Sequence, residues 1–158
     1  AGIAMNGRKV FCYSIGNFST LRCLEQIRND ICYHNLDVCI VSVGGGFGYG
    51  QLGMSHHATE DLAIMRALPN INCYVPYDSL NCELVTQRIL GTSGPSYLRL
   101  ERAPLDFSSK LSSEVFMNPL TSNEAFTEIV VVTCGGITIE GINLVERIKK
   151  YGGEEPVI

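Results

Sequence analysis

The amino-acid sequence predicts an α/β fold in which helices flank a parallel sheet. Short runs rich in β-branched residues alternate with amphipathic stretches along the 158 residues, which is the pattern of βαβ units. One of these runs, Val38–Val43, is mostly apolar, as expected for a strand that helices cover on both faces. Hydrophobic residues make up 46% of the chain and charged residues 18%, which excludes a disordered protein and supports a sizeable core.

The elements follow from local patterns. Residues 9–15 predict a strand, and Ser19 is a candidate N-cap for a helix that runs to about His34. After Val38–Val43, a short helix is expected at residues 58–67 and a third strand at 72–75. Asp78 or Ser79 can cap a helix that ends near residue 91, and residues 95–102 alternate as a fourth strand.

The chain changes character after the fourth strand. We predict a first α/β domain at residues 1–105, a polar linker at 106–127, and the opening βαβ unit of a second α/β domain at 128–158. In the last segment, residues 128–133 predict a strand, and Thr138 begins a helix that continues to about Tyr151.

Charge and cysteine usage exclude several classes of function. The net charge is −4 and the pI is near 5.3, which argues against nucleic acid or an anionic membrane as a partner. No apolar run approaches the length of a membrane span. The 7 cysteines form no CxxC pair, so we expect neither a zinc site nor a disulfide scaffold, but reduced thiols in a cytoplasmic protein.

A glycine-rich loop at residues 44–53 leads to His56 and His57. Its glycines permit positive φ and close approach to a ligand, so the loop could carry an active-site turn or form a sharp structural connection. The histidines could perform acid–base chemistry, or one could cap the helix beside Glu60 and Asp61. Adjacent imidazoles rarely reach one ion, and we predict no metal ligand.

Three stretches of the sequence carry a more specific signature. They are Gly53-Met-Ser-His-His-Ala-Thr-Glu-Asp-Leu-Ala-Ile-Met-Arg-Ala-Leu-Pro-Asn70, then Val75-Pro-Tyr-Asp78, then Gly94-Pro-Ser-Tyr-Leu-Arg-Leu-Glu-Arg102. In this order they resemble the pyrimidine-binding domain of the transketolase family of thiamine-diphosphate enzymes. Residues 13–29 extend the resemblance towards the start of the chain. Thr133-Cys-Gly-Gly resembles the start of the family's C-terminal domain.

The resemblance implies two cofactor-binding candidates. In this family the cofactor is held between two subunits, and the pyrimidine domain binds its aminopyrimidine ring. Phe18 is the ring expected to stack on that heterocycle. Because the turn is one residue longer than in well-known members, Tyr13 is the alternative.

The same resemblance implies a catalytic residue and three substrate contacts. His56 matches the histidine that faces the reacting carbon and assists proton transfer, and His57 matches its more variable neighbour. Arg102, with Arg99 as a second candidate, matches the arginine that binds a sugar phosphate. A solvated strand end is the competing interpretation of both arginines.

Three departures from the family pattern shape the expected function. The catalytic glutamate is expected upstream of Ala1, and the motif for Mg²⁺ and diphosphate is expected in another domain. Leu52 and Gly44 stand where typical transketolases have an acidic residue and a histidine. We therefore expect transfer of a ketol or acyl-anion unit between sugar or sugar-phosphate substrates other than those of a conventional pentose-phosphate transketolase.

The expected protein is the C-terminal half or small subunit of a transketolase-like enzyme, inactive alone. It would use thiamine diphosphate and Mg²⁺ with a diphosphate-binding domain or large subunit, as a homodimer or heterotetramer. One alternative is a non-catalytic relic or assembly subunit that keeps the fold and dimer surface. A nucleotide-binding oxidoreductase built on the glycine loop is a third class, but the acidic ribose contact is lacking.

Overall fold

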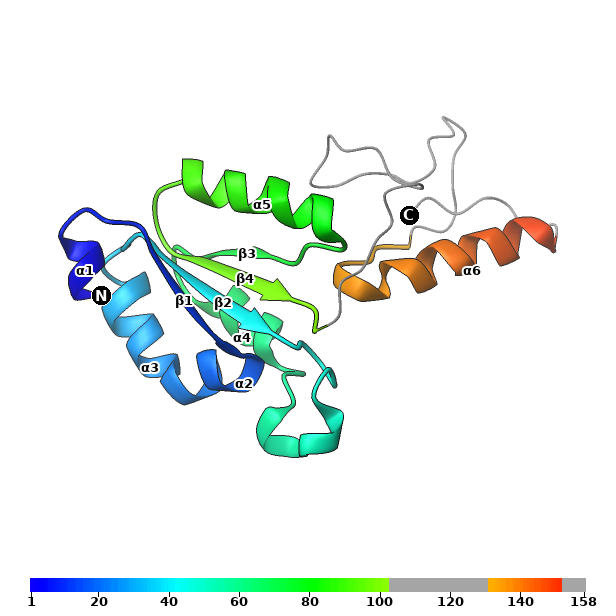
Figure 1. Cartoon of the computed structure of the whole chain (residues 1–158), viewed down its shortest axis with the longest axis horizontal. Coiled ribbons are helices and arrows are strands. Elements are labelled where there is room, and N and C mark those ends of the chain that lie inside the picture. Colours follow the sequence, from blue (N-terminus) through cyan, green and yellow to red (C-terminus); the bar gives the residue numbers. More distant parts are fainter. Residues whose placement is uncertain (103–130, 152–158) are drawn as a thin grey trace.

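The computed structural model describes residues 1–102 and 131–151 (Figure 1). In this part of the chain, four parallel strands form a sheet in the order β1-β2-β4-β3. The strands are β1 (Val10–Ile15), β2 (Val38–Val43), β3 (Asn72–Tyr74) and β4 (Ser96–Leu100). The predicted fold class, a parallel sheet flanked by helices, is confirmed.

The two strands on one side of the sheet differ in burial. β2 pairs with both β1 and β4, and its residues Val38 to Ser42 are buried. This burial explains why its sequence is apolar on both faces. β1 pairs with β2 along one edge, and three consecutive residues in its middle are exposed.

Helices cover the two faces of the sheet (Figure 1). On one face lie α1 (Gly2–Met5), α2 (Gly16–Ser19), the 3₁₀ turn η1 (Leu21–Cys23), α3 (Leu24–Gln26), the π-helical turn η2 (Ile27–Cys32) and α4 (Asp61–Ala67). On the other face lies α5 (Ser79–Gly91).

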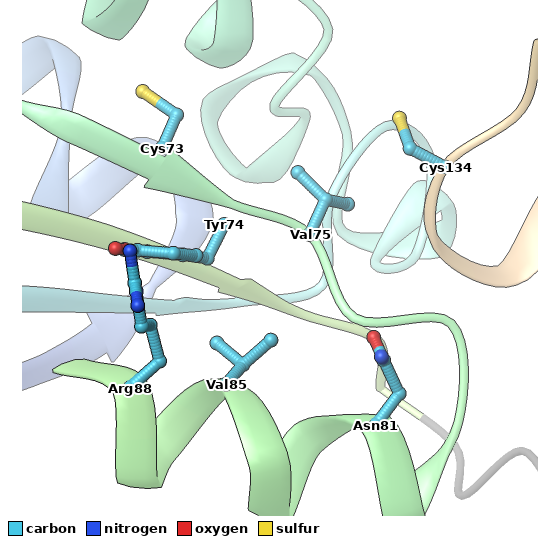
Figure 2. Close-up of a pocket in the computed structure, with 7 residues that line it drawn as sticks. All are labelled: Cys73, Tyr74, Val75, Asn81, Val85, Arg88 and Cys134. Atoms are coloured by element: carbon cyan, nitrogen blue, oxygen red, sulfur yellow. The ribbon is translucent and has the colours of Figure 1, made fainter. Parts of the chain in front are cut away.

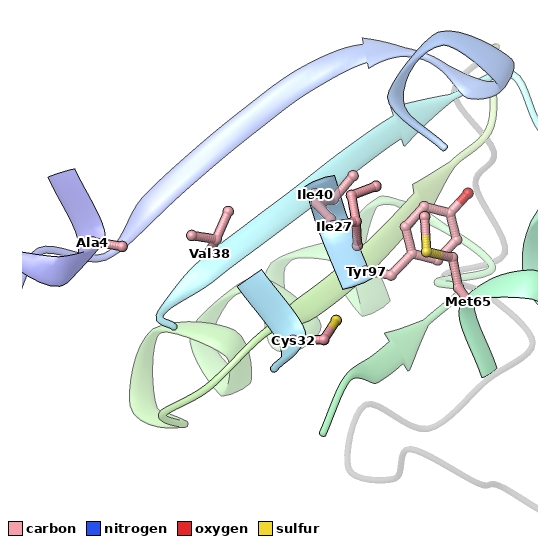
Figure 3. Packing of buried hydrophobic residues seen from close by; sticks show 7 residues of the cluster. All are labelled: Ala4, Ile27, Cys32, Val38, Ile40, Met65 and Tyr97. Atoms are coloured by element: carbon pink, nitrogen blue, oxygen red, sulfur yellow. The ribbon is translucent and has the colours of Figure 1, made fainter. Parts of the chain in front are cut away.

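Each face has its own hydrophobic core. Figure 3 shows the core on the α3 face, formed by Ala4, Ile27, Cys32, Val38, Ile40, Met65 and Tyr97. The core under α5 is formed by Cys39, Val41, Val85, Ile89 and Leu98. The alternation of β2 side chains between these two cores fixes the sheet between its helical layers.

Some element boundaries differ from those predicted. The helix expected from Ser19 begins at Gly16 and continues as short turns of different pitch, and the Ser19 hydroxyl donates to carbonyls rather than capping. α4 begins three residues later than expected because Ala58 forms a bridge with Gly46. The Asp78 cap is confirmed, since Oδ1 accepts a hydrogen bond from the Asn81 amide at 2.7 Å.

The C-terminal segment contains η5 (Gly135–Ile137) and α6 (Thr138–Lys150). The Gly136 amide donates to Glu101 Oε1 at 3.2 Å, which ties η5 to the end of β4. Residues 131–134 have no regular secondary structure, and the predicted linker and residues 128–130 lie outside the described residues. The domain boundaries therefore stay a prediction. Within the described ranges, no helix has the length and apolarity needed to cross a membrane.

Candidate active site

The segments that follow β1, β2 and β4 meet at the carboxyl end of the sheet (Figure 1). β1 leads into α2, which carries Phe18. β2 leads into the glycine-rich loop, which in the structure continues through the 3₁₀ turns η3 (Gly50–Leu52) and η4 (Met54–His56) to Ala58, and the name glycine loop covers this whole segment below. Parallel α/β sheets bind their ligands at this end.

Phe18 and His56 are brought together at this end of the sheet. Their ring centroids lie 4.9 Å apart with the planes inclined by 60°. The Arg22 guanidinium lies 4.3 Å from the Phe18 centroid, within cation–π range. The Asn17 side-chain amide donates to the Ser55 carbonyl at 2.9 Å, so the segments that carry the two rings are also joined directly.

The two histidines are held in different ways. Nδ1 of His56 lies 2.9 Å from the Ser55 hydroxyl, so Nε2 is the nitrogen that can face a substrate. Nε2 of His57 lies 3.3 Å from the Gly50 carbonyl oxygen, and its ring meets Phe47 edge-on at 5.0 Å. His57 is therefore engaged with its own loop, whereas His56 faces the turn that carries Phe18.

A backbone bridge between Gly46 and Ala58 joins the two ends of the glycine loop, and these two residues are called the neck below. Gly46 and Ala58 exchange two backbone hydrogen bonds of 2.7 and 2.9 Å. Gly46 has a φ of +59°, a conformation that L side chains rarely adopt. A Cβ on Gly16, at the start of α2, would lie 2.7 Å from the Ala58 Cβ. The absence of that Cβ lets the neck pack tightly against the turn that carries Phe18.

Arg99, in β4, and Arg102, two residues after the end of β4, both contact the glycine loop. Arg102 Nη1 donates to the Gly48 carbonyl at 3.2 Å, and its guanidinium lies 5.0 Å from the Tyr49 centroid. Arg99 lies deeper, with its side chain 14% exposed and its Nε 3.0 Å from Asp61 Oδ2. The roles of both arginines as phosphate ligands stay predictions.

Tyr13 lies apart from this cluster. It pairs in register with Val41 in the middle of β1, and it is 71% exposed. Neither Arg22 nor the buried pairing of Asp61 was predicted from the sequence. A cationic residue one helical turn after Phe18 is the signal that could have identified Arg22.

A separate hollow of about 450 Å³ lies between β3 and α5 (Figure 2). Its lining residues are Cys73, Tyr74, Val75, Asn81, Val85, Arg88 and Cys134, none of them a predicted site residue. Burial raises the pKa of the Cys73 thiol to about 11, so this thiol stays protonated near neutral pH. In residues 1–102 and 131–151, no three His, Cys, Asp or Glu side chains are grouped as a metal site requires.

The family model of the transketolase pyrimidine-binding domain matches residues 1–106. This chain belongs to the transketolase family. A subunit of apulose-4-phosphate transketolase from Phocaeicola vulgatus is 36% identical over 103 residues, which cover 65% of this chain and 33% of the relative. The subunit of the same name from Actinobacillus succinogenes is 25% identical over 158 residues, or 100% of this chain and 51% of the relative.

A solved transketolase structure also resembles this chain. It is described as "Split gene transketolase, inactive beta4 tetramer" and superposes with a TM-score of 0.80 at 28% identity, covering 99% of this chain and 50% of that one. The family predicted from the motifs is thus confirmed. The chain spans between a third and about half of the length of these relatives.

Proposed function

We propose that this transketolase-family chain forms the pyrimidine-binding wall of a composite active site. It would act as the C-terminal half or small subunit of a cytoplasmic transferase that moves a ketol or acyl-anion unit between sugar-like substrates. The observation that supports this proposal is the meeting of Phe18 and His56 at the carboxyl end of the sheet.

The residues present fit the aminopyrimidine of thiamine diphosphate. Phe18 is half-buried, and contacts with Arg22 and His56 restrict its ring. A fixed aromatic ring suits a flat heterocycle, because aromatic groups pack in offset or edge-to-face geometry. When bound, thiamine diphosphate supplies carbanion-stabilising chemistry, and Mg²⁺ would be held mainly by another domain.

His56 is the group that would hold or move a proton. With Nδ1 engaged by the Ser55 hydroxyl, Nε2 can donate to a substrate oxygen or accept its proton. His57 and Arg102 would contact the outer part of a sugar or sugar-phosphate substrate. Arg102 is exposed, and its hydrogen bond to the loop carbonyl can be exchanged for a phosphate oxygen.

The surface beside the site suggests how a partner would complete it. Three large apolar side chains of the glycine loop are exposed, with Met54 at 84%; they are Phe47, Leu52 and Met54. Apolar surface concentrated on one loop is typical of an interface. We propose that a diphosphate-binding domain or large subunit covers this loop, within a homodimer or heterotetramer.

The test is transfer activity of the natural protein, purified with its accompanying domains or subunits. We expect ketol transfer to require added thiamine diphosphate and Mg²⁺. His56→Ala should lower kcat by about 100-fold or more, the range for loss of an acid–base group. The 158-residue chain alone should give no turnover, and turnover by that chain alone would overturn the composite site. A complex that binds no thiamine diphosphate would favour the assembly-subunit alternative.

A further inference from the structure

A buried ion pair lies beneath the neck of the glycine loop. The Asp61 side chain, at the first position of α4, is 1% exposed. Its Oδ2 accepts a hydrogen bond from the Tyr97 hydroxyl at 2.5 Å and lies 3.0 Å from Arg99 Nε. Among the described residues, Asp61 Oδ1 has no hydrogen-bond partner, and Arg99 Nε has no aligned hydrogen bond. A buried pair with incomplete hydrogen bonding is weak evidence for a purely stabilising role.

The other end of the guanidinium supports the loop. Arg99 Nη2 lies 3.5 Å from the Ala58 carbonyl oxygen, which also accepts the Gly46 amide at the neck. A Cβ on Gly45 would lie 2.0 Å from Arg99 Nε, so the guanidinium occupies the space that a side chain there would need. Arg99 therefore supports the neck through its contacts with Ala58 and Gly45.

The neck also connects to the turn that carries Phe18. Ala58 packs against Gly16, two residues before Phe18, and lies two residues after His56. A shift of the neck would thus move His56 relative to Phe18. The chain of contacts runs from Asp61 through Arg99 and Ala58 to both rings.

We infer that Asp61 and Arg99 are positioning residues that set the spacing between His56 and Phe18. The spacing of the two rings does not depend on the proposed function. Only its use, which is to place the cofactor ring beside the proton-transfer group, rests on that proposal. It gives Arg99 a task different from the substrate contact that the family resemblance implied. The planar guanidinium places Nε 3.0 Å from Asp61 Oδ2 while Nη2 donates to the Ala58 carbonyl, and the single ammonium of lysine cannot occupy both positions.

The test is NMR on the protein labelled at its Phe and His rings. The wild type should show a nuclear Overhauser contact between Phe18 and His56, and slow exchange of the Gly46 and Ala58 amides. Arg99→Lys should lose the ring contact and speed exchange of both amides about tenfold or more, although it retains the charge.

Three further variants distinguish a specific effect on the loop from simple unfolding. Gly45→Ala should displace the guanidinium and give the same changes, whereas Gly50→Ala should not, because its Cβ would meet nothing closer than 3.9 Å. Asp37→Asn, which weakens an ion pair at the opposite end of the sheet, should lower the melting temperature without altering the ring contact.

Two outcomes would overturn the positioning role. One is that Arg99→Lys or Gly45→Ala keeps the contact between the Phe18 and His56 rings. The other is that Asp37→Asn loses this ring contact. A protein that binds no thiamine diphosphate but shows these NMR changes would refute the proposed function and leave the positioning role standing. In an active complex, Arg99→Lys should lower kcat more than it raises KM for the sugar substrate.

Discussion

Two ion pairs at opposite ends of the sheet differ in how completely they are satisfied. At the amino end, Lys9 Nζ donates to Asp37 Oδ1 at 2.8 Å and to the Thr92 carbonyl at 2.7 Å. The same Asp37 oxygen accepts the Gly94 amide at 2.9 Å. The side chains of Lys9 and Asp37 are 17% and 34% exposed, so water reaches both.

At the carboxyl end, the Asp61–Arg99 pair is more deeply buried and less completely hydrogen-bonded. The amino-end pair joins loops that have no assigned chemistry, and its geometry serves stability. The carboxyl-end pair lies beneath the loop that carries His56. The difference agrees with the inferred positioning role, since Arg99 of the buried pair contacts the carbonyl of Ala58 at the neck of that loop.

The largest contrast is expected from removing one acid at each end. Asp61→Ala should cost about 3–5 kcal/mol of the free energy of unfolding, because Arg99 is left buried without its partner. Asp37→Ala should cost about 0–1 kcal/mol, since its pair is partly solvated. Urea titration of both variants measures this contrast. Equal losses would contradict the distinction between the two ends.

A smaller effect is expected from filling the space that Arg99 occupies. Gly45→Ala should cost about 1–3 kcal/mol of the free energy of unfolding, the usual range for overpacking. Gly50→Ala, in the same loop, should change it by less than about 0.5 kcal/mol, as at an ordinary surface position. Indistinguishable urea midpoints would show that the guanidinium does not fill this space.

Alkaline pH should destabilise the protein through one buried group in the hydrophobic core on each face of the sheet. Burial raises the pKa of the Cys39 thiol from 9.0 to about 12, opposed in part by the charge of Lys9. Burial and the hydrogen bond to Asp61 raise the pKa of the Tyr97 hydroxyl above its ordinary range.

Above about pH 9 the unfolded chain loses these protons before the folded protein does. The free energy of unfolding should then fall with rising pH, by up to about 1.4 kcal/mol per pH unit for each group. Cys39→Ala should flatten the profile from about pH 9, and Tyr97→Phe from about pH 10. Profiles parallel to the wild type would argue against these raised pKa values.

The smallest effect on stability is expected at Ser55. Ser55→Ala removes an exposed contact with His56 Nδ1 and should change the free energy of unfolding by less than about 0.5 kcal/mol. It should still alter the tautomer balance of His56, which ¹⁵N chemical shifts of the ring report. Ser55→Thr is the control and should preserve the wild-type shifts.

Local patterns predicted much of the fold. The apolar run of β2 and the Asp78 cap are properties of neighbouring residues, so the sequence alone could identify them. Phe18 and His56 could be proposed because motifs in a fixed order resembled one family. Their contact, however, depends on α2 and the glycine loop meeting at one end of the sheet.

The role of Arg99 could not be predicted in the same way. Asp61 was interpreted from its place at a helix start, where a carboxylate favours the helix dipole. Its burial depends on α4 packing against β4, and its partners Tyr97 and Arg99 lie far along the chain. The bridge between Gly46 and Ala58 likewise joins residues whose own sequence pattern favoured a loop and a helix.

The most direct test is the affinity of the natural complex for thiamine diphosphate, measured by calorimetry with wild type, Phe18→Ala and Tyr13→Ala. Loss of an aromatic stacking partner costs about 1–3 kcal/mol for a nucleobase, which corresponds to about fivefold or more in Kd. We expect Phe18→Ala to weaken binding by at least that factor and Tyr13→Ala to leave it unchanged. Unchanged binding by Phe18→Ala, or weakening confined to Tyr13→Ala, would contradict the placement of the cofactor against Phe18.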